Sequence, residues 1–241
     1  IEVWLQNKEG SYSQKKSSDF IRNKITIVSD LALSDLDLDG DLDLLAIQEE
    51  DDDQFILYLN EGSDSNGSPL FKEAYTFYRS TDEVSASRII AISDYDNDGD
   101  QDVYIPRKFG INWLLENQTL KKIGDQIVYN ENPYPFFIEV AIAKGIDDFN
   151  ASESGSTGYG AAWGDFNNDN YFDLYLSNWG DNILYQNNSN QAFTNMNSEM
   201  DLKSDSLSNG SAWGDFNNDG YLDVWAANIK KQDDLYLNIN G

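Results

Sequence analysis

The chain has 241 residues, 43 acidic and 16 basic side chains, a net charge of −27, and neither histidine nor cysteine. The lack of cysteine excludes disulfides and thiol chemistry, and the lack of histidine excludes Ser-His-Asp triads and the usual zinc sites. Strong acidity argues against binding to nucleic acid or anionic membranes, which need clustered Lys and Arg, and no run of about 18 apolar residues offers a transmembrane helix.

A nine-residue acidic pattern, D-x-[DN]-x-D-[GN]-x-x-D, occurs at residues 35–43, 94–102, 165–173 and 215–223. Calcium takes about six to eight oxygen ligands in a flexible geometry. Positions 1, 3, 5 and 9 supply side-chain oxygens, and position 7 can supply a backbone carbonyl. We expect about four Ca²⁺ sites, with no catalytic residue and no other cofactor. The predicted metal residues are Asp35, Asp37, Asp39, Asp41, Asp43, Asp94, Asp96, Asp98, Asp100, Asp102, Asp165, Asn167, Asp169, Tyr171, Asp173, Asp215, Asn217, Asp219, Tyr221 and Asp223.

Position 6 needs a left-handed backbone, which explains glycine in three copies and Asn170 in the other. The pattern also fits the start of an EF-hand loop, but an EF-hand requires Glu at position 12 and flanking helices. Position 12 is apolar in every copy: Ala46, Ile105, Leu176 and Ala226. The short apolar runs after each loop read as strands, so each loop is expected to join two strands. The competing interpretation is an acidic turn that binds nothing.

In chain order, residues 1–24 read as the end of a preceding repeat, followed by repeats at 25–80, 81–140, 141–200 and 201–241, each with one loop. The expected first strands are 25–28, 88–92, 160–164 and 210–214. The expected third strands end in Asn or Glu and are 55–60, 112–116, 182–187 and 234–238. A weaker fourth strand carries an aromatic residue: Tyr12, Phe71, Phe136 and Phe137, or Phe193. Residues 139–144 are irregular or form one helical turn.

Four strands per repeat, at a period near 50 residues with insertions, predict an all-β propeller, or a propeller segment, of four-stranded antiparallel blades. Residues 1–241 then form a single propeller region. Both ends of the chain fall at a third strand. We therefore expect a segment of a longer propeller or of a longer chain.

Residues 159–188 and 211–228 resemble the FG-GAP/VCBS repeat of integrin-α-type β-propellers, most closely in the cartilage-acidic-protein-like subgroup. The first two repeats lack the Trp-Gly pair before the loop and match mainly through the loop itself. The resemblance implies calcium and the propeller fold. It does not specify function, because such propellers serve adhesion, glycan binding and enzyme scaffolds.

Extracellular calcium modules bind at roughly 10⁻⁴ to 10⁻³ M, so the loops favour an extracellular, cell-surface or periplasmic location. The leading hypothesis is a non-catalytic module that binds a protein or glycan at the cell surface or in the extracellular matrix, without membrane insertion. One alternative is a structural subunit or scaffold of a surface assembly or filament. Another is the scaffold of a polysaccharide-active enzyme.

Several other residues have a structural interpretation, and most of them also have a functional one. Arg88, Arg107 and Lys108 are surface charge or contacts for an acidic sugar. Trp163 and Trp213 are expected to pack between blades. Trp179 either packs on its own blade or stacks on a sugar ring. The acidic run 49–53 is a solvated hairpin tip or a site for a cation or basic partner.

Overall fold

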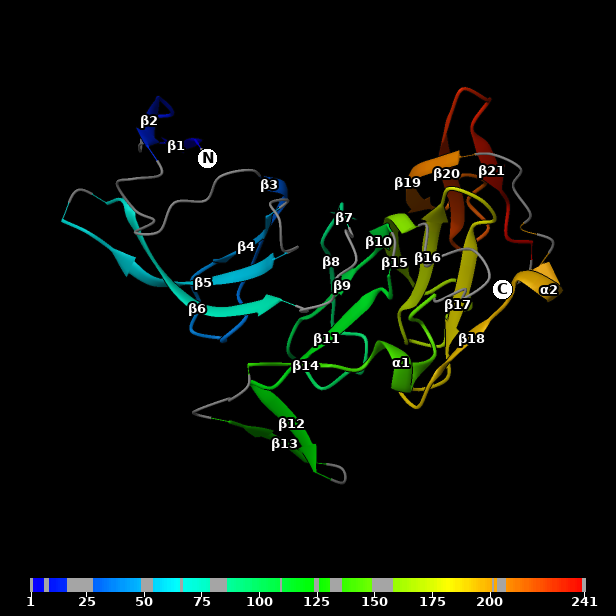
Figure 1. Cartoon of the computed structure of the whole chain (residues 1–241), viewed down its shortest axis with the longest axis horizontal. Helices are drawn as coiled ribbons and strands as arrows, with labels where there is room; N and C mark the ends of the chain where they lie inside the picture. Colours follow the sequence, from blue (N-terminus) through cyan, green and yellow to red (C-terminus); the bar gives the residue numbers. More distant parts are fainter. Residues whose placement is uncertain are drawn as a thin grey trace. The chain divides into compact units, whose positions relative to one another are not determined.

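The computed structural model describes residues 2–6, 9–16, 28–48, 54–65, 67–78, 86–108, 110–123, 126–130, 136–148, 158–200, 202 and 207–239. The chain divides into two compact units, Ile1–Thr81 and Asp82–Gly241. Strands form almost all the regular structure of the described residues, as Figure 1 shows, which confirms the all-β prediction. The acidic run 49–53 lies outside the described residues.

The described residues of unit 1 form one four-stranded antiparallel sheet and one hairpin. The sheet follows chain order: β3 (Val28–Ser34), β4 (Asp43–Gln48), β5 (Gln54–Ser63) and β6 (Pro69–Tyr78). The hairpin pairs β1 (Glu2–Gln6) with β2 (Tyr12–Lys16). Leu44 and Ala46 alternate along β4 and pack with Ile56 and Tyr58 of β5 in one apolar cluster. The alternate residues of the two strands are buried too: Leu45, Ile47, Phe55 and Leu57.

In unit 2, the part of the chain that the structure describes forms two four-stranded sheets and a three-stranded sheet, all antiparallel. The first contains β8 (Ala91–Ser93), β9 (Asp102–Ile105), β11 (Trp113–Asn117) and β14 (Phe137–Glu139). The second contains β15 (Gly158–Gly164), β16 (Asp173–Asn178), β17 (Ile183–Asn187) and β18 (Phe193–Asn195). The third contains β19 (Leu207–Gly214), β20 (Asp223–Ile229) and β21 (Asp234–Tyr236). This sequential antiparallel order is that of a propeller blade.

Two small pairs and two single-turn helices complete unit 2. β7 (Ala86–Ser87) pairs with β10 (Arg107–Lys108), and β12 (Leu120–Ile123) pairs with β13 (Gln126–Tyr129). The helices are α1 (Ala141–Lys144) and α2 (Asn197–Met200). The turn expected over residues 139–144 is therefore present as α1. No helix among the described residues is long and apolar enough to cross a membrane.

The core of unit 2 lies between successive blades, and β16 shows why. Every residue of this strand is buried, and its side chains point alternately to the two faces of the sheet. Leu174 and Leu176 enter the cluster shared with the preceding blade, whereas Tyr175 enters the cluster shared with the following one. Since both faces must be covered, each blade depends on its neighbours for a core.

We number the loops and their blades 1 to 4 in chain order, with loops at 35–43, 94–102, 165–173 and 215–223. The two tryptophans before the loops of blades 3 and 4 pack between blades, as predicted. Trp163 meets Tyr104 of the preceding blade edge to face at 6.0 Å and donates its indole N–H to the Ala91 carbonyl. Trp213 repeats this contact with Tyr175 at 6.1 Å and donates to the Ala162 carbonyl. The Trp-Gly pair thus contributes to the joint between blades.

Several predicted strand boundaries were wrong. Of the strand expected at 25–28, residues 25–27 lie outside the described residues, and the strand that pairs with β4 runs from Val28 to Ser34, beyond the expected end, because it must reach the loop at Asp35. In blade 2 the first strand is Ala91–Ser93, and the third continues past Glu116 to Asn117. All four aromatic fourth strands are present, at β2, β6, β14 and β18. The division of 1–241 into repeats at 25–80, 81–140, 141–200 and 201–241 stays a prediction.

Candidate calcium-binding loops

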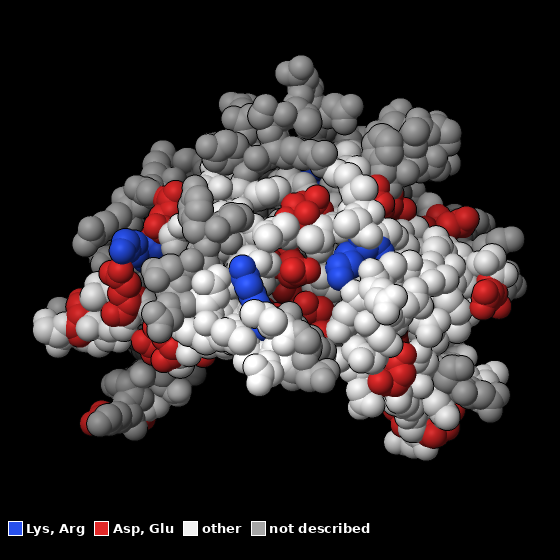
Figure 2. Space-filling view, turned by 90° about the horizontal axis from the view of Figure 1, so that it is seen from below, with Lys and Arg blue, Asp and Glu red and all other residues white. Residues whose placement is uncertain are grey.

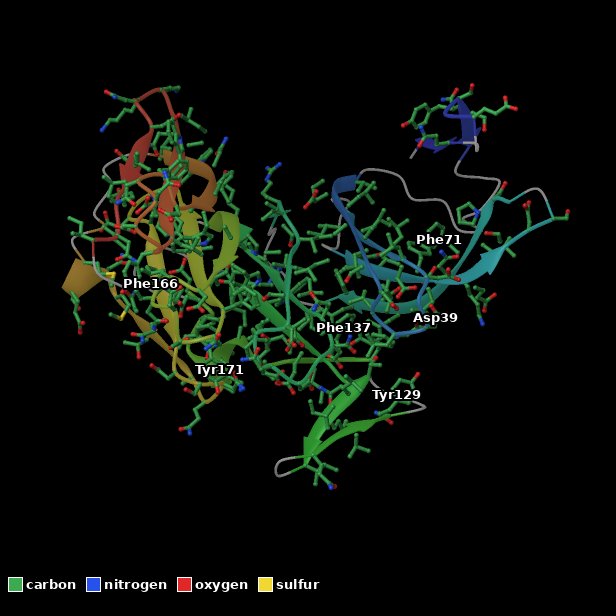
Figure 3. The ribbon with its side chains drawn as sticks, turned by 180° about the vertical axis from the view of Figure 1, so that it is seen from behind. Asp39, Phe71, Tyr129, Phe137, Phe166 and Tyr171 are labelled. Atoms are coloured by element: carbon green, nitrogen blue, oxygen red, sulfur yellow. The ribbon has the colours of Figure 1, made fainter. Side chains whose placement is uncertain are left out.

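Each acidic loop joins the first strand of a blade to the second. The loops connect β3 to β4, β8 to β9, β15 to β16, and β19 to β20. Figure 3 labels Asp39 in the loop of unit 1, and Phe166 and Tyr171 in the loop 165–173 of unit 2. The predicted strand–loop–strand arrangement is therefore present four times, and the helices of an EF-hand are not.

The carboxylate at position 1 ties the loop to itself. It accepts the backbone N–H of position 6 at 2.9–3.1 Å, in the pairs Gly40 to Asp35, Gly99 to Asp94, Asn170 to Asp165 and Gly220 to Asp215. The side chains at positions 3 and 5 each accept the backbone N–H two residues later, as in Asp37 from Asp39 and Asp39 from Asp41. Such local bonds are why Asp and Asn recur at these positions.

Two positions in each loop are left-handed. Position 6 was predicted to be so and is, with φ between 69° and 102° across Gly40, Gly99, Asn170 and Gly220. Position 4 was missed. Its φ lies between 56° and 61° in Leu38, Asn97, Asn168 and Asn218. Asparagine at position 4 in three copies is the sequence signal, because Asn adopts this region more easily than most residues.

The carboxylate at position 9 anchors the loop to its blade. This aspartate is buried in all four copies, at 0–1 % exposure. One oxygen accepts the N–H of position 2, and the other accepts the N–H of an asparagine within the third strand or just after it. In blade 3, Asp173 accepts from Phe166 at 3.1 Å and from Asn187 at 2.8 Å. These bonds fix where the loop begins and ends.

That asparagine also joins neighbouring blades. The Asn187 amide donates to the Tyr95 carbonyl in the preceding blade's loop at 2.8 Å and to Phe172 in its own loop at 3.2 Å. The Asn238 amide donates to Phe166 of the preceding loop at 2.7 Å. The sequence showed Asn at these strand ends but gave no sign that it crosses between blades.

The loops of unit 2 are linked in series through position 4. The Asn97 amide of loop 2 donates to the Asn170 carbonyl in loop 3 at 2.9 Å, and the Asn168 amide donates to the Gly220 carbonyl in loop 4 at 3.0 Å. Each bond runs from position 4 of one loop to position 6 of the next. The left-handed positions are therefore also where adjacent loops meet.

A family model for the FG-GAP-like repeat matches residues 35–105 and 165–226, more than half of the chain. The chain belongs to the FG-GAP-like repeat family. Both matched segments begin at the first aspartate of a loop. No curated protein matches the chain.

The four FG-GAP-like loops concentrate negative charge without basic neighbours in the loop sequences. In loop 2, burial and then the Asp98 carboxylate raise the pKa of Asp96 to about 7. Burial raises the pKa of Asp100 to about 8, and Asp98 and Asp96 add to that effect. Burial also raises the pKa of Asp43 to about 6 and of Asp173 to about 7. In the absence of a cation, these carboxylates are costly to ionise.

The residues present fit a hard divalent cation. Three carboxylate oxygens come within 4.8 Å of one another in loop 1, from Asp35, Asp37 and Asp39. Among the described residues, the Oδ1 atoms of Asp35 and Asp100 are buried without a hydrogen-bond partner. Buried carboxylate oxygens left in this way are stabilised by a positive charge, and oxygen-only ligand sets select calcium or magnesium over softer metals.

The loops differ in which predicted ligands come together. Loop 2 gathers Asp94, Asp96 and Asp102 within 4.8 Å. Its Asp100 instead accepts the Leu120 N–H at 2.6 Å. In loops 3 and 4 an amide stands at position 3. Asn167 donates to Asp169 at 3.0 Å, and Asn217 donates to Asp219 at 2.9 Å. These amides relieve part of the repulsion that loops 1 and 2 carry in full.

Figure 2 shows Asp and Glu side chains distributed over the face seen from below, alongside isolated Lys and Arg side chains. The acidic character inferred from composition is thus a property of the surface. The assignment of individual ligands to calcium stays a prediction.

Proposed function

We propose that this chain is a calcium-stabilised extracellular propeller module that binds a protein or glycan at the cell surface or in the matrix and catalyses no reaction. The observation that carries the proposal is the set of four acidic loops: each has a buried aspartate at position 9, and loops 1 and 2 each bring three carboxylate oxygens within 4.8 Å of one another. FG-GAP-like repeats occur in extracellular adhesion-type domains, which supports the location. The finer placement in the cartilage-acidic-protein-like subgroup belongs to the same proposal.

Calcium would supply positive charge to each loop. Positions 1, 3, 5 and 9 would hold it through side-chain oxygens, and the position 7 residue through its carbonyl. Hydrogen bonds made by the chain's own residues hold the loops in place. The position 9 aspartate holds the loop on its blade, and the position 4 asparagines of loops 2 and 3 tie neighbouring loops together. Calcium binding would thereby stabilise contacts between blades as well as single turns.

A scaffold role is the second candidate, and the last blade favours it. Trp225, Leu235 and Leu237 of this blade are each more than 40 % exposed. A nearby cavity of about 670 Å³ is lined by Phe166, Leu202 and other apolar residues. Apolar side chains gathered on one surface mark places where another protein surface packs. A chain that works as a subunit of an assembly would cover them.

Binding to arrayed glycans and matrix proteins, with calcium and with a chelator, tests the proposal. We expect calcium-dependent binding to at least one class and no release of sugar or peptide products over the same incubation. Product release would contradict the non-catalytic assignment. Concentration-dependent filaments seen by electron microscopy, without binding to any arrayed ligand, would favour the scaffold role instead.

A further inference from the structure

Two repeat positions bring cations and aromatic rings together at the end of the blades opposite the loops. The first position lies six residues before the loop's first aspartate and holds Arg88, Tyr159 and Asn209 in blades 2, 3 and 4. The second lies fourteen residues after that aspartate and holds Lys108 and Trp179 in blades 2 and 3. We call these five residues the cationic-aromatic row.

Backbone irregularities set up the row. The pairing of β15 with β16 shifts register between Gly158 and Gly160, and that of β19 with β20 shifts between Ser208 and Gly210. Tyr159 and Asn209 are the extra residues of these bulges. A bulge releases a residue from the ladder and redirects its side chain.

Glycine lets the strands of adjacent blades approach closely here. A Cβ on Gly160 would lie 2.7 Å from the Asn209 carbonyl oxygen, and one on Gly158 would lie 2.9 Å from Pro106. β15 accordingly contacts both β10 and β19. The bulge residues of successive blades are thus brought side by side.

The side chains of the row contact one another. Tyr159 and Trp179 stack with ring centroids 4.2 Å apart and planes within 5°. The Trp179 indole N–H donates to the Asn209 side-chain oxygen at 3.3 Å. These contacts fix the orientation of the Trp179 ring, which is nevertheless 36 % exposed.

Two cations flank the stack. The Lys108 ammonium lies 4.7 Å from the Trp179 ring centroid and 5.7 Å from that of Tyr159. The Lys108 ammonium therefore contacts both rings of the stack, and Trp179 keeps 36 % of its surface exposed beside it. The Arg88 guanidinium lies 5.9 Å from the Tyr159 ring centroid. Arg107 is not part of this surface, because it is 3 % exposed and packs on Trp113.

We propose that the cationic-aromatic row binds an anionic polysaccharide, with Trp179 stacking on a sugar ring and Lys108 and Arg88 pairing with the acidic groups of the chain. This rests on the proposed binding function and names its ligand class and site. A flat, oriented indole face suits a pyranose ring, and cations beside it select an acidic sugar over a neutral one. The row crosses three blades, so it suits a linear chain of several sugars.

The row also explains how a strongly acidic protein would bind an anion. The net charge of −27 repels polyanions at long range, but salt screens this repulsion beyond roughly 8–10 Å. Pairing with Lys108 and Arg88 occurs at contact distance, where screening is weak. Placing the row at the strand ends remote from the acidic loops keeps the two opposite electrostatic environments apart.

The test is titration of the calcium-loaded full chain with trigalacturonate, short dextran sulfate, neutral dextran and a glutamate hexapeptide, followed by tryptophan fluorescence and calorimetry. We expect binding of trigalacturonate, dextran sulfate or both. Their relative affinity tells whether carboxylate or sulfate is preferred. We expect neutral dextran and the peptide to bind at least about tenfold more weakly.

Matched variants locate the site. Trp179→Ala and Lys108→Gln should each weaken binding about tenfold or more, whereas Trp179→Phe should retain part of it. The controls Tyr129→Ala and Lys72→Gln change an exposed aromatic residue and a surface lysine elsewhere and should bind as the wild type does. All five proteins should keep the calcium-dependent melting temperature of the wild type, which separates loss of contact from loss of fold.

Three results would overturn the inference. In the first, the wild type binds neither anionic sugar. In the second, the Trp179→Ala and Lys108→Gln variants bind the anionic sugars as tightly as the wild type does. In the third, the wild type binds the glutamate peptide as tightly as the anionic sugars, or more tightly. If the chain binds an arrayed protein or neutral glycan and Trp179→Ala leaves that binding intact, the proposed module function stands and only this site fails.

Discussion

Asn187 offers a direct test of how the blades are joined. Its side chain is 1 % exposed and makes three hydrogen bonds, to the Tyr95 and Phe172 carbonyls and from the Asn190 N–H. Replacing it by alanine leaves those three backbone groups without their partner. At about 1 kcal/mol for each, Asn187→Ala should lower the free energy of unfolding by ~3 kcal/mol, or the melting temperature by roughly 6–12 °C.

The assay is urea unfolding in saturating calcium, followed by tryptophan fluorescence. The matched control is Asn188→Ala, the next residue, whose exposed side-chain amide donates to the Thr194 hydroxyl at 2.8 Å. That change should cost within about 0.5 kcal/mol. If Asn187→Ala costs no more than Asn188→Ala, the asparagine does not hold the blades together and the reasoning fails.

Three other predictions concern the backbone and the charge of the loops. Leu38→Asn should raise the free energy of unfolding by about 0.5–1 kcal/mol in calcium, because Leu38 has φ 61°, and calorimetry showing no gain would contradict this. Gly160→Ala should cost about 1–3 kcal/mol in chemical unfolding, since its Cβ would meet the neighbouring blade's backbone. The repeat-equivalent Gly210→Ala, whose Cβ meets nothing within 4 Å, should be neutral, so equal costs would refute the packing argument. The raised pKa values of Asp96, about 7, and Asp100, about 8, mean that the calcium-free fold binds more protons than the unfolded chain. Without calcium, melting temperature should therefore rise as pH falls from 8 to 5, whereas calcium affinity should fall, and scans showing the reverse would contradict the charge account.

Local patterns predicted the loops well because their chemistry is local. The spacing of Asp35, Asp37 and Asp39 is short enough to define a turn, and glycine at position 6 reports a left-handed backbone directly. The short apolar strands likewise predicted the four-stranded blade, and the Trp-Gly pair predicted that Trp163 packs between blades. In each case the type of residue at one position is enough to indicate the local structure it needs.

What the sequence did not predict depends on residues far apart in the chain. Asn187 reaches Tyr95 across 92 positions, and nothing near either residue announces the contact. The cationic-aromatic row was visible only as separate suggestions about Lys108 and Trp179. Their meeting depends on the bulge at Tyr159, and bulges leave no strong local signal apart from flanking glycines. Strand boundaries in the first two repeats failed for the same reason, since pairing partners set them.

The central claim is that calcium occupies the loops and stabilises the fold. Thermal unfolding with and without calcium should be compared between the wild type and a quadruple variant, Asp39→Ala, Asp98→Ala, Asp169→Ala and Asp219→Ala. At calcium near 100 times the dissociation constant, each site contributes roughly 2.7 kcal/mol. The wild type should then gain roughly 10 °C or more with calcium, and the variant should gain little. An equal response of the two proteins, or no response of the wild type, would contradict the account.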